Sequence, residues 1–292
     1  MRLTRRHSLT GLGAALAART TFAADPARTG LGGELARIET RVGGRLGVAV
    51  HDTGSGQRHG HRSDERFPMC STFKVLACAA ILARVDMGQE DLSRRIRFEA
   101  SDLVTYSPVT KSRVGGGGMA MAELCEAGIT QSDNTAGNLI LSSLGGPSGV
   151  TAYARALGDA VTRLDRTETG LNDAAPGDPR DTTTPGAMTA NLQALVLGDA
   201  LSRPSRDQLT AWLVANQTGA AKLRAGLPGD WRVGDKTGGG DWGTTNDVAV
   251  IWPPGRKPVI MSVYLTGTKA SFDDRNAAIA AVGRAVETWV IA

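Results

Sequence analysis

The sequence has little of what several functional classes require. It contains four histidines in 292 residues, at positions 7, 51, 59 and 61, and no cluster of His, Asp and Cys at the spacing of a zinc site. No run of about 20 apolar residues occurs, which is the length that a membrane-spanning helix needs. The net charge is +4, but the basic residues are interleaved with acids. We therefore expect neither a metal centre, nor a membrane span, nor a nucleic-acid partner.

The rest of the composition is that of an ordinary soluble protein, with 41% hydrophobic and 21% charged residues. The N-terminus has the pattern of an export signal: three arginines lie within the first six residues, a modestly apolar stretch covers 9–18, and small residues follow at Ala23 and Ala24. Residues 4–9 also match a twin-arginine signal. We expect residues 1–24 to be a signal peptide and the mature protein to be periplasmic or secreted, with no membrane contact after cleavage.

Three cysteines remain for an oxidising compartment: Cys70, Cys78 and Cys125. Cys70 and Cys78 are eight residues apart on one predicted helix, so about 12 Å separates them along its axis. A disulfide needs Cα atoms within about 7 Å. Cys125 could pair with either of the other two, and we favour a Cys78–Cys125 bridge, with Cys70 left as a small buried thiol.

Hydrophobic periodicity, together with turn residues at 53–56 that predict a hairpin, indicates strands near both ends of the mature chain and helices between them. The predicted strands are 46–52, 57–61, 231–237, 247–253 and 258–267. The predicted helices are 33–42, 71–85, 119–128, 135–144, 150–157, 189–201 and 272–290. This order predicts an α/β (α+β) fold, in which a five-stranded antiparallel sheet built from both termini has flanking helices and carries an inserted all-helical domain.

Two units follow from this order, a sheet domain formed by 25–67 and 213–292 and a helical domain formed by 68–212. The helix 71–85 is apolar on nearly every face, which places it in the middle of the protein. Within the helical unit, residues 163–185 are polar, aperiodic and rich in Asp, Thr, Gly and Pro. A loop of that length in a compact domain is usually functional or disordered.

Ser71 and Lys74 form the first candidate site. At positions i and i+3 of a helix, the hydroxyl and the amine share one face and lie close together. The helix N-terminus adds N–H groups and partial positive potential where an oxyanion would form. An amine held among apolar side chains loses basicity through desolvation, so it can accept a proton near neutral pH. Taken alone, a Ser-x-x-Lys pattern arises by chance in a chain of this length.

Two further motifs follow along the chain. Ser132-Asp133-Asn134 offers a hydroxyl that could relay a proton and an amide that could hold a carbonyl or the Lys74 amine, although the same residue types are also the commonest helix N-caps. Lys236-Thr237-Gly238 lies on a predicted strand. It offers a cation for a carboxylate, a hydroxyl donor, and a glycine that lets a bulky ligand lie against the backbone.

In this order, the three motifs resemble the signature set of the serine penicillin-recognising enzymes. The segment 166–172, Arg-Thr-Glu-Thr-Gly-Leu-Asn, resembles the loop signature of the class A β-lactamases, and the resemblance covers essentially the whole mature chain. It implies hydrolysis of the β-lactam amide bond of penicillins and cephalosporins through a Ser71 acyl-enzyme, which a water activated by Glu168 hydrolyses. It also implies β-lactam resistance, no cofactor, small-molecule β-lactam substrates and inhibitors as partners, and a monomer.

The resemblance also implies a role for individual residues. The catalytic group consists of Ser71, Lys74, Ser132, Glu168 and Asn172. The substrate-binding group consists of Asn134, Tyr106, Lys236, Thr237, Gly238, Gly239 and Arg275. The backbone N–H groups of Ser71 and Gly239 would form an oxyanion hole. An Arg166–Asp181 ion pair would clamp the loop, and Cys78 and Cys125 fall where some members carry a disulfide.

The sequence departs from the family pattern at a few positions. Thr169 replaces the proline that often follows the catalytic glutamate. Thr245 stands where many penicillinases carry an arginine for the substrate carboxylate, and the surrounding segment is similar to the cefotaxime-hydrolysing branch, which implies that Arg275 near the last helix compensates. Cys70 is similar to a cysteine of carbapenem-hydrolysing relatives, but its partner position is Gly240. That bridge cannot form, so we do not predict carbapenemase activity from it.

Other reaction classes fit less well. A Ser-His-Asp hydrolase needs a histidine, and beyond the signal these occur only within 51–61, where we expect a surface hairpin. A D,D-peptidase shares the first three motifs but lacks the deacylating glutamate. A β-lactam sensor domain stays acylated and needs a membrane tether, and no span for one remains after the signal.

Overall fold

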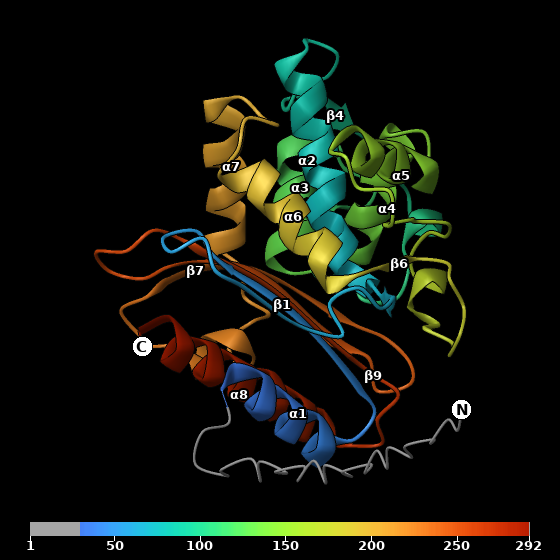
Figure 1. The fold of residues 1–292 in the computed structure, drawn as a ribbon. Helices are drawn as coiled ribbons and strands as arrows, with labels where there is room; N and C mark the ends of the chain where they lie inside the picture. The colour runs from blue at the N-terminus through green and yellow to red at the C-terminus, as the bar shows by residue number, and fades with distance from the viewer. Residues whose placement is uncertain (1–29, 292) are drawn as a thin grey trace, which may run out of the picture.

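The structure, a computed structural model, describes residues 30–291, so the predicted signal peptide lies outside the described residues. Its centre is a five-stranded sheet with the order β2-β1-β9-β8-β7, and every neighbouring pair is antiparallel (Figure 1). The strands are β1 (Arg45–Asp52), β2 (Arg58–His61), β7 (Arg232–Gly239), β8 (Thr245–Trp252) and β9 (Val259–Thr266). The sheet is therefore built from both ends of the chain, as predicted.

Helices cover both faces of the sheet (Figure 1). One face is covered by α1 (Leu31–Val42) and α8 (Phe272–Ile291). The helices on the other side are α2 (Phe73–Asp86), α3 (Met121–Thr130), α4 (Asn134–Ser143), α5 (Pro147–Ala156), α6 (Pro185–Val196) and α7 (Arg203–Val214). The predicted α/β fold with an inserted helical part is confirmed. The boundaries predicted for the two units stay a prediction.

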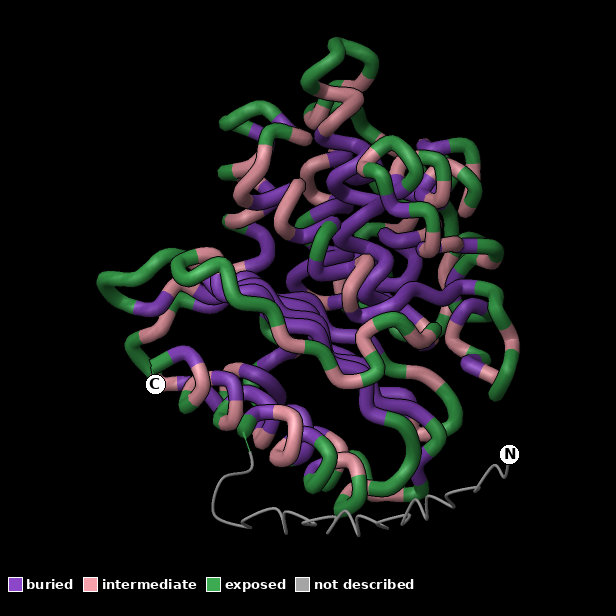
Figure 2. Tube along the Cα trace, viewed as in Figure 1, coloured by how far each residue is buried: buried purple, intermediate pink, exposed green. Residues whose placement is uncertain are grey.

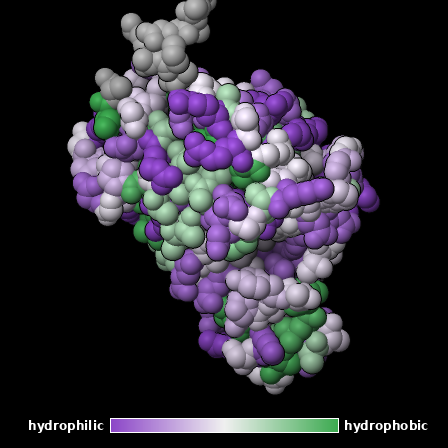
Figure 3. Space-filling view, turned by 90° about the horizontal axis from the view of Figure 1, so that it is seen from below, coloured by the Kyte–Doolittle hydropathy of each residue, from purple (hydrophilic) through white to green (hydrophobic). Residues whose placement is uncertain are grey.

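Two apolar clusters hold these layers together, one on each face of the sheet. Successive strand residues point to opposite faces, and β8 illustrates this: Val248 and Val250 pack with the helical part, whereas Ala249 and Ile251 pack toward α1 and α8. Strand β8 is therefore buried on both sides, and the middle strands of the sheet are buried in Figure 2, whereas the edge strand β2 is partly exposed. Figure 3 views the molecule from the side of α1 and α8, where hydrophilic atoms surround paler, weakly apolar surface.

The predicted central helix is present, but it begins later than predicted. Every residue of α2 from Phe73 to Leu82 is buried, as its all-round apolar pattern predicts. Ser71 lies just before α2, in the short 3₁₀ turn η1 (Cys70–Thr72). Cys70 has a left-handed backbone, with φ of 45°, which an α-helix does not allow. The α-helix therefore cannot include Cys70, and it starts at Phe73, after the 3₁₀ turn that contains the serine.

Some elements were not predicted. The sequence 203–214 has few apolar residues, but Ser202 caps α7 by accepting a hydrogen bond from Ser205, and a proline lies in the first turn. Thr184 caps α6 in the same way, and α6 therefore starts at 185 instead of the predicted 189. It ends at 196 instead of the predicted 201. The remaining unpredicted elements are β3 (Phe67–Pro68), β4 (Arg95–Ile96), β5 (Met119–Ala120), β6 (Thr182–Thr183), η2 (Ala100–Asp102), η3 (Thr110–Arg113), η4 (Gly170–Asn172) and η5 (Leu223–Gly226).

The predicted Cys78–Cys125 disulfide is wrong for this structure. Cys70, Cys78 and Cys125 are all free and buried. The Cys78 thiol points at the backbone oxygen of Cys125, 3.8 Å away, and donates a weak hydrogen bond to it. Burial and the neighbouring Cys78 raise the pKa of Cys125, which keeps it a thiol. The expectation that Cys70 is a small buried thiol is confirmed.

Within residues 30–291, none of the helices has both the length and the apolar character that crossing a membrane would require.

Candidate active site

Ser71 and Lys74 lie in contact, as their spacing predicts. Lys74 Nζ donates a hydrogen bond to Ser71 Oγ over 2.9 Å. The same nitrogen donates to Asn134 Oδ1 at 2.7 Å and to the backbone oxygen of Ser132 at 3.0 Å. Because Lys74 is fully buried, these acceptors replace water around its nitrogen. The first two motifs therefore meet at one point.

A glycine on α4 makes room for this lysine. A Cβ atom built on Gly137 would lie 2.8 Å from Lys74 Cε, so any side chain there would push the amine aside. Just before Gly137, Asp133 caps α4 by accepting a hydrogen bond from the backbone N–H of Ala136 at 2.8 Å. The N-cap interpretation of the second motif is thus confirmed for Asp133.

Ser132 lies between the two lysines of the motifs. Its hydroxyl accepts a hydrogen bond from Lys236 Nζ at 2.9 Å, and its backbone oxygen accepts one from Lys74. Ser132 has a left-handed backbone, with φ of 58°, and so do Cys70 and Tyr106 nearby. Such conformations typically cost about 1–3 kcal/mol in residues with side chains and tend to occur at functional sites.

Strand β7 forms the other side of the site. Lys236 faces the helical part, where its amine donates to the Ser132 hydroxyl, and the Thr237 hydroxyl lies 2.6 Å from that of Thr218. Gly238 lies against the chain that precedes the serine, since a Cβ atom there would be 2.8 Å from Met69 O. Only a glycine allows this close approach of two backbones. Gly239 is the last residue of the strand.

Burial lowers the pKa of Lys236 to about 7, and the neighbouring Lys74 contributes to the shift. The acids Asp235, Glu168 and Asp247 act against it but do not cancel it. A lysine with this pKa loses its charge as the pH rises through neutrality. The positive charge that Lys236 offers to a substrate is therefore lost as the pH rises through about 7.

Glu168, on the polar loop 163–185, lies against the side chains of Ser71 and Lys74. Ser71 Oγ donates to Glu168 Oε1 at 3.2 Å, and Lys74 Nζ lies 2.8 Å from the same oxygen, with both the lysine and the glutamate side chains fully buried. Asn172 Nδ2 donates to Glu168 Oε2 at 2.6 Å. Asn172 Oδ1 is buried and has no hydrogen-bond partner within residues 30–291. A free acceptor therefore lies beside the glutamate carboxylate.

The base of the loop is clamped as the family resemblance implies. Arg166 Nε lies 2.6 Å from Asp181 Oδ2, and the other oxygen of this buried aspartate accepts the backbone N–H groups of Asp165 and Arg166. The two ends of the loop are thus joined by one carboxylate. The peptide bond between Glu168 and Thr169 is cis, although no proline is present.

Sequence reasoning missed the residue that holds the backbone of Glu168. Asn138 Oδ1 accepts the N–H of Glu168 and Asn138 Nδ2 donates to its carbonyl, both at 2.9 Å. The one signal in the sequence is spacing, since Asn138 follows Asn134 by one helical turn and therefore shares its face of α4. Nothing else separates it from a surface asparagine.

Tyr106 lies at the edge of the site with 57% of its surface exposed. Its backbone oxygen accepts a hydrogen bond from the N–H of Asn134 at 3.0 Å. Asp133 anchors the same segment, because its carboxylate accepts the backbone N–H groups of Val109 and Thr110, each at 2.9 Å. The second motif therefore positions the exposed aromatic ring as well as Lys74.

Arg275, assigned by resemblance to the substrate carboxylate, lies beside a second cation. The Arg275 guanidinium and Lys222 Nζ are 5.7 Å and 5.5 Å from the centre of the same ring, that of Phe272. Lys222 donates to Asn276 Oδ1 at 2.9 Å, and burial lowers its pKa to about 8. Two cations, Lys222 and Arg275, therefore lie beside the Phe272 ring, and either could contact a substrate carboxylate.

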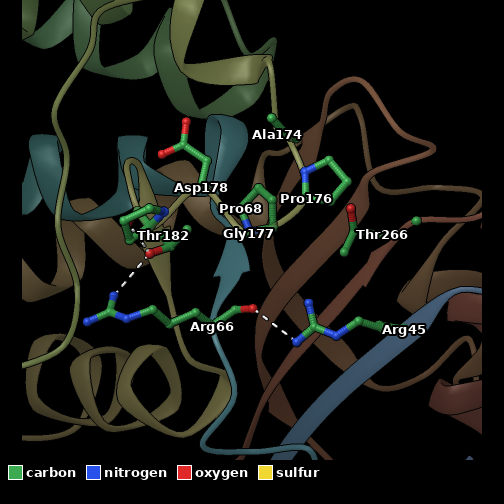
Figure 4. Close-up of a pocket in the computed structure, with 12 residues that line it drawn as sticks. Arg45, Arg66, Pro68, Ala174, Pro176, Gly177, Asp178, Thr182 and Thr266 are labelled. Carbon is green, nitrogen blue, oxygen red and sulfur yellow. Dashed lines mark hydrogen bonds between the residues drawn. The ribbon is translucent and has the colours of Figure 1, made fainter.

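Other features of the structure lie apart from these residues. A cavity of about 300 Å³ separates the distal part of the loop, 174–179, from the strand ends at Arg45 and Thr266 (Figure 4). Its lining includes none of the motif residues.

His51 was expected on the surface, but it is buried and lies 3.0 Å from Gln193 Oε1, because α6 covers that part of β1. Within residues 30–291, no three His, Cys, Asp or Glu side chains are grouped so as to hold a metal ion.

Comparisons with known proteins agree with this geometry. Residues 31–290 match the family model described as "Beta-lactamase enzyme family". The chain is 54% identical to β-lactamase AST-1 of Nocardia asteroides over 91% of this chain and 84% of that protein. It is 51% identical to β-lactamase CTX-M-8 of Citrobacter amalonaticus over 87% of both chains. A solved ancestral (GNCA) class A β-lactamase is 64% identical, with a TM-score of 0.88, covering 89% of this chain and 99% of that one.

Proposed function

The chain belongs to the β-lactamase enzyme family as a class A serine β-lactamase, and from this premise we propose which of its residues carry out the hydrolysis. The single observation that supports the proposal is the meeting of three groups. A hydroxyl, an amine and a loop carboxylate lie within 3.2 Å of one another at Ser71, Lys74 and Glu168. Acyl transfer to a serine followed by hydrolysis needs a nucleophile, a group that takes its proton and a base that activates water, and these three side chains can supply them.

In the first step, Ser71 Oγ attacks the carbonyl carbon of the β-lactam ring. The hydroxyl proton passes to Lys74 or Glu168, both of which lie at hydrogen-bond distance from Ser71 Oγ. The negative charge on the carbonyl oxygen is stabilised by the backbone N–H groups of Ser71 and Gly239, an arrangement often worth about 10²–10³ in rate.

The carbon–nitrogen bond of the ring then breaks. The ring nitrogen takes a proton from the Ser132 hydroxyl, which accepts a hydrogen bond from Lys236 Nζ at 2.9 Å. Ser132 recovers the proton that left Ser71 by way of Lys74, whose nitrogen contacts both Ser71 Oγ and the Ser132 backbone oxygen, so acylation gains and loses no proton. Lys236 also offers a positive charge for the substrate carboxylate, while Thr237 offers a hydroxyl next to it. The product of this step is an ester on Ser71 with the ring opened.

Hydrolysis of that ester depends on the loop. Glu168 takes a proton from a water molecule, whose oxygen attacks the ester carbonyl, and the Ser71 hydroxyl is regenerated. Asn172 supports this step in two ways: it donates to the Glu168 carboxylate, and its unpartnered Oδ1 can accept a hydrogen bond from the same water. Asn134 and Asn138 keep the lysine and the glutamate in place. Both act as positioning residues.

The experiment that tests this assignment counts the nitrocefin molecules consumed per enzyme molecule. A hydrolase consumes many equivalents, whereas a D,D-peptidase or a β-lactam sensor stops after one, because neither hydrolyses its acyl-enzyme quickly. Continued turnover by the protein supports the assignment. A burst of one equivalent followed by no further colour change would refute it.

The pH dependence follows from Lys236. Because its pKa is lowered to about 7, the lysine is charged below that pH and becomes neutral as the pH rises. We expect kcat/KM for benzylpenicillin to fall on the alkaline side with an apparent pKa of about 7, since this ratio reports groups of the free enzyme. A stopped-flow series from pH 6 to 10 measures it. An ester of the same substrate, which lacks the carboxylate, is the control, and an equal fall for the ester would exclude this origin.

The partner of the substrate carboxylate is proposed to be Arg275, with Lys222 as the second candidate. Arg275→Ala should raise KM for carboxylated substrates about 10-fold or more, since a hydrogen bond between charged groups is typically worth about 1.5–3 kcal/mol. Arg284→Ala, an exposed arginine on the same helix, serves as the control. An unchanged KM in Arg275→Ala together with a raised KM in Lys222→Gln would reassign the role to Lys222.

We further propose that the mature protein acts as an exported monomer on penicillins and cephalosporins. Support for export comes from the basic and small residues of 1–24. We expect no nucleic-acid or membrane partner for the mature chain, since its basic residues are mixed with acids.

A further inference from the structure

Phe272 is a large aromatic residue in an unusual setting. It is the first residue of α8, and 61% of its surface is exposed. Two cations lie against its ring, Lys222 Nζ at 5.5 Å and the guanidinium carbon of Arg275 at 5.7 Å. Cations near an aromatic face are attracted to it, and so the ring holds both of them at one place while most of its own surface stays open.

This group of residues is connected to the strand that is proposed to bind substrate. Thr218 Oγ1 lies 2.6 Å from Thr237 Oγ1, and Lys222 follows Thr218 after one tight turn, in which its N–H donates to Gly219 O at 3.0 Å. Asp247 lies opposite Thr237 in the β7–β8 register and accepts the N–H of the residue after Lys222. Thr237 is therefore connected to the Phe272 ring through Thr218, the turn that follows it, and the side chain of Lys222.

The cations also have hydrogen-bonding capacity that the protein leaves unused. Arg275 Nε is buried and has no hydrogen-bond partner within residues 30–291. Lys222, which is buried as well, donates one hydrogen bond among the described residues, to Asn276 Oδ1. An ammonium group can donate three. Buried donors of this kind favour an anionic or strongly polar partner, and the exposed ring beside them favours a flat one.

We propose that Phe272 is a specificity-determining residue of this β-lactamase, whose exposed ring stacks on a flat heteroaromatic substituent next to the substrate carboxylate, such as the C3 heteroarylthiomethyl group of a cephalosporin. The inference rests on the proposed function, because it assumes that the carboxylate is bound by Lys236 and Thr237 together with Arg275 or Lys222. In a cephalosporin, the carboxylate and the C3 substituent are on adjacent ring carbons. A substrate held by its carboxylate at this end of β7 therefore directs that substituent toward the ring.

The test compares two cephalosporins with the same acylamino group, one with a heteroarylthiomethyl group at C3 and the other with a methyl group. Phe272→Ala should raise KM for the first about 3- to 10-fold more than for the second, with kcat little changed, because stacking holds the ground state and the transition state alike. Phe272→Tyr keeps the ring and should retain the wild-type ratio of the two KM values. Met87→Ala is a matched control, since Met87 is also 61% exposed but follows the end of α2.

The outcomes separate the possible roles of the ring. An equal rise in KM for both cephalosporins would mean that Phe272 only positions the two cations, which would overturn the proposal. An unchanged pair of KM values would overturn it as well. Failure of the wild-type enzyme to turn over either cephalosporin would instead refute the proposed function, so the two failures are distinguishable.

Discussion

Ser71→Ala should lose turnover of every β-lactam by a factor on the order of 10⁶, the loss seen when the nucleophile of a serine hydrolase is removed. The reason is that, among residues 30–291, no other hydroxyl is placed as Ser71 Oγ is, 2.9 Å from Lys74 Nζ and 3.2 Å from Glu168 Oε1. The substrate should still bind, because Lys236 and Thr237 are untouched. Steady-state rates with nitrocefin, at enzyme concentrations high enough to detect a residual rate, measure the loss.

The matched control for this variant is Ser101→Ala, an exposed serine in η2. It should keep the wild-type rate and the wild-type melting temperature. If Ser71→Ala melts like the wild type but hydrolyses nitrocefin at more than about one-hundredth of its rate, another group is the nucleophile. Ser132, whose hydroxyl contacts Lys236, would then be the next candidate.

Glu168→Ala should separate the two halves of the reaction. Acylation of Ser71 continues, since Lys74 remains beside the hydroxyl, but hydrolysis of the ester slows by about 10²–10⁴-fold, the typical contribution of a general base. Removing the carboxylate also leaves the buried Lys74 without its ion-pair partner. Glu168→Gln, which preserves the shape of the side chain, is therefore measured alongside. In both variants, nitrocefin should give a burst of one equivalent and then a slow steady rate.

Glu126→Ala, an exposed acid on α3, is the control for charge removal and should behave like the wild type. The decisive comparison is between the burst and the steady rate. Loss of the burst together with the steady rate would assign Glu168 to acylation instead of hydrolysis. An unchanged steady rate would show that the loop carboxylate is not the base.

The sheet and the motifs could be predicted from the sequence because they depend on local patterns. Apolar patterns predicted four strands of the sheet, the turn residues 53–56 predicted the fifth as a hairpin partner, and the motif spacing predicted the Ser71–Lys74 contact. The start of α2 could not be predicted in the same way. Cys70 has a left-handed backbone, and the segment around η1 makes tertiary contacts, such as that between Gly238 and the backbone of Met69. Short-range hydrophobic periodicity does not predict contacts between residues so far apart in the chain.

The errors concern side-chain direction, which a sequence pattern does not contain. Cys78 and Cys125 are neighbours, as predicted, but both are free thiols, and that of Cys78 lies against the backbone oxygen of Cys125. His51 lies on a strand of the hairpin, but α6 packs over it and buries it. Asn138 was missed for the same reason, because its side chain acts by hydrogen bonding to the backbone of Glu168, a residue 30 positions away in the chain.

The most direct test of the account is the intact mass of the Glu168→Ala protein after brief mixing with benzylpenicillin, followed by peptide mapping. The account predicts one adduct per molecule, heavier by the mass of the whole substrate and located on Ser71, that persists after excess substrate is removed. A protein that stays unmodified while benzylpenicillin is consumed, or an adduct on a different residue, would contradict it.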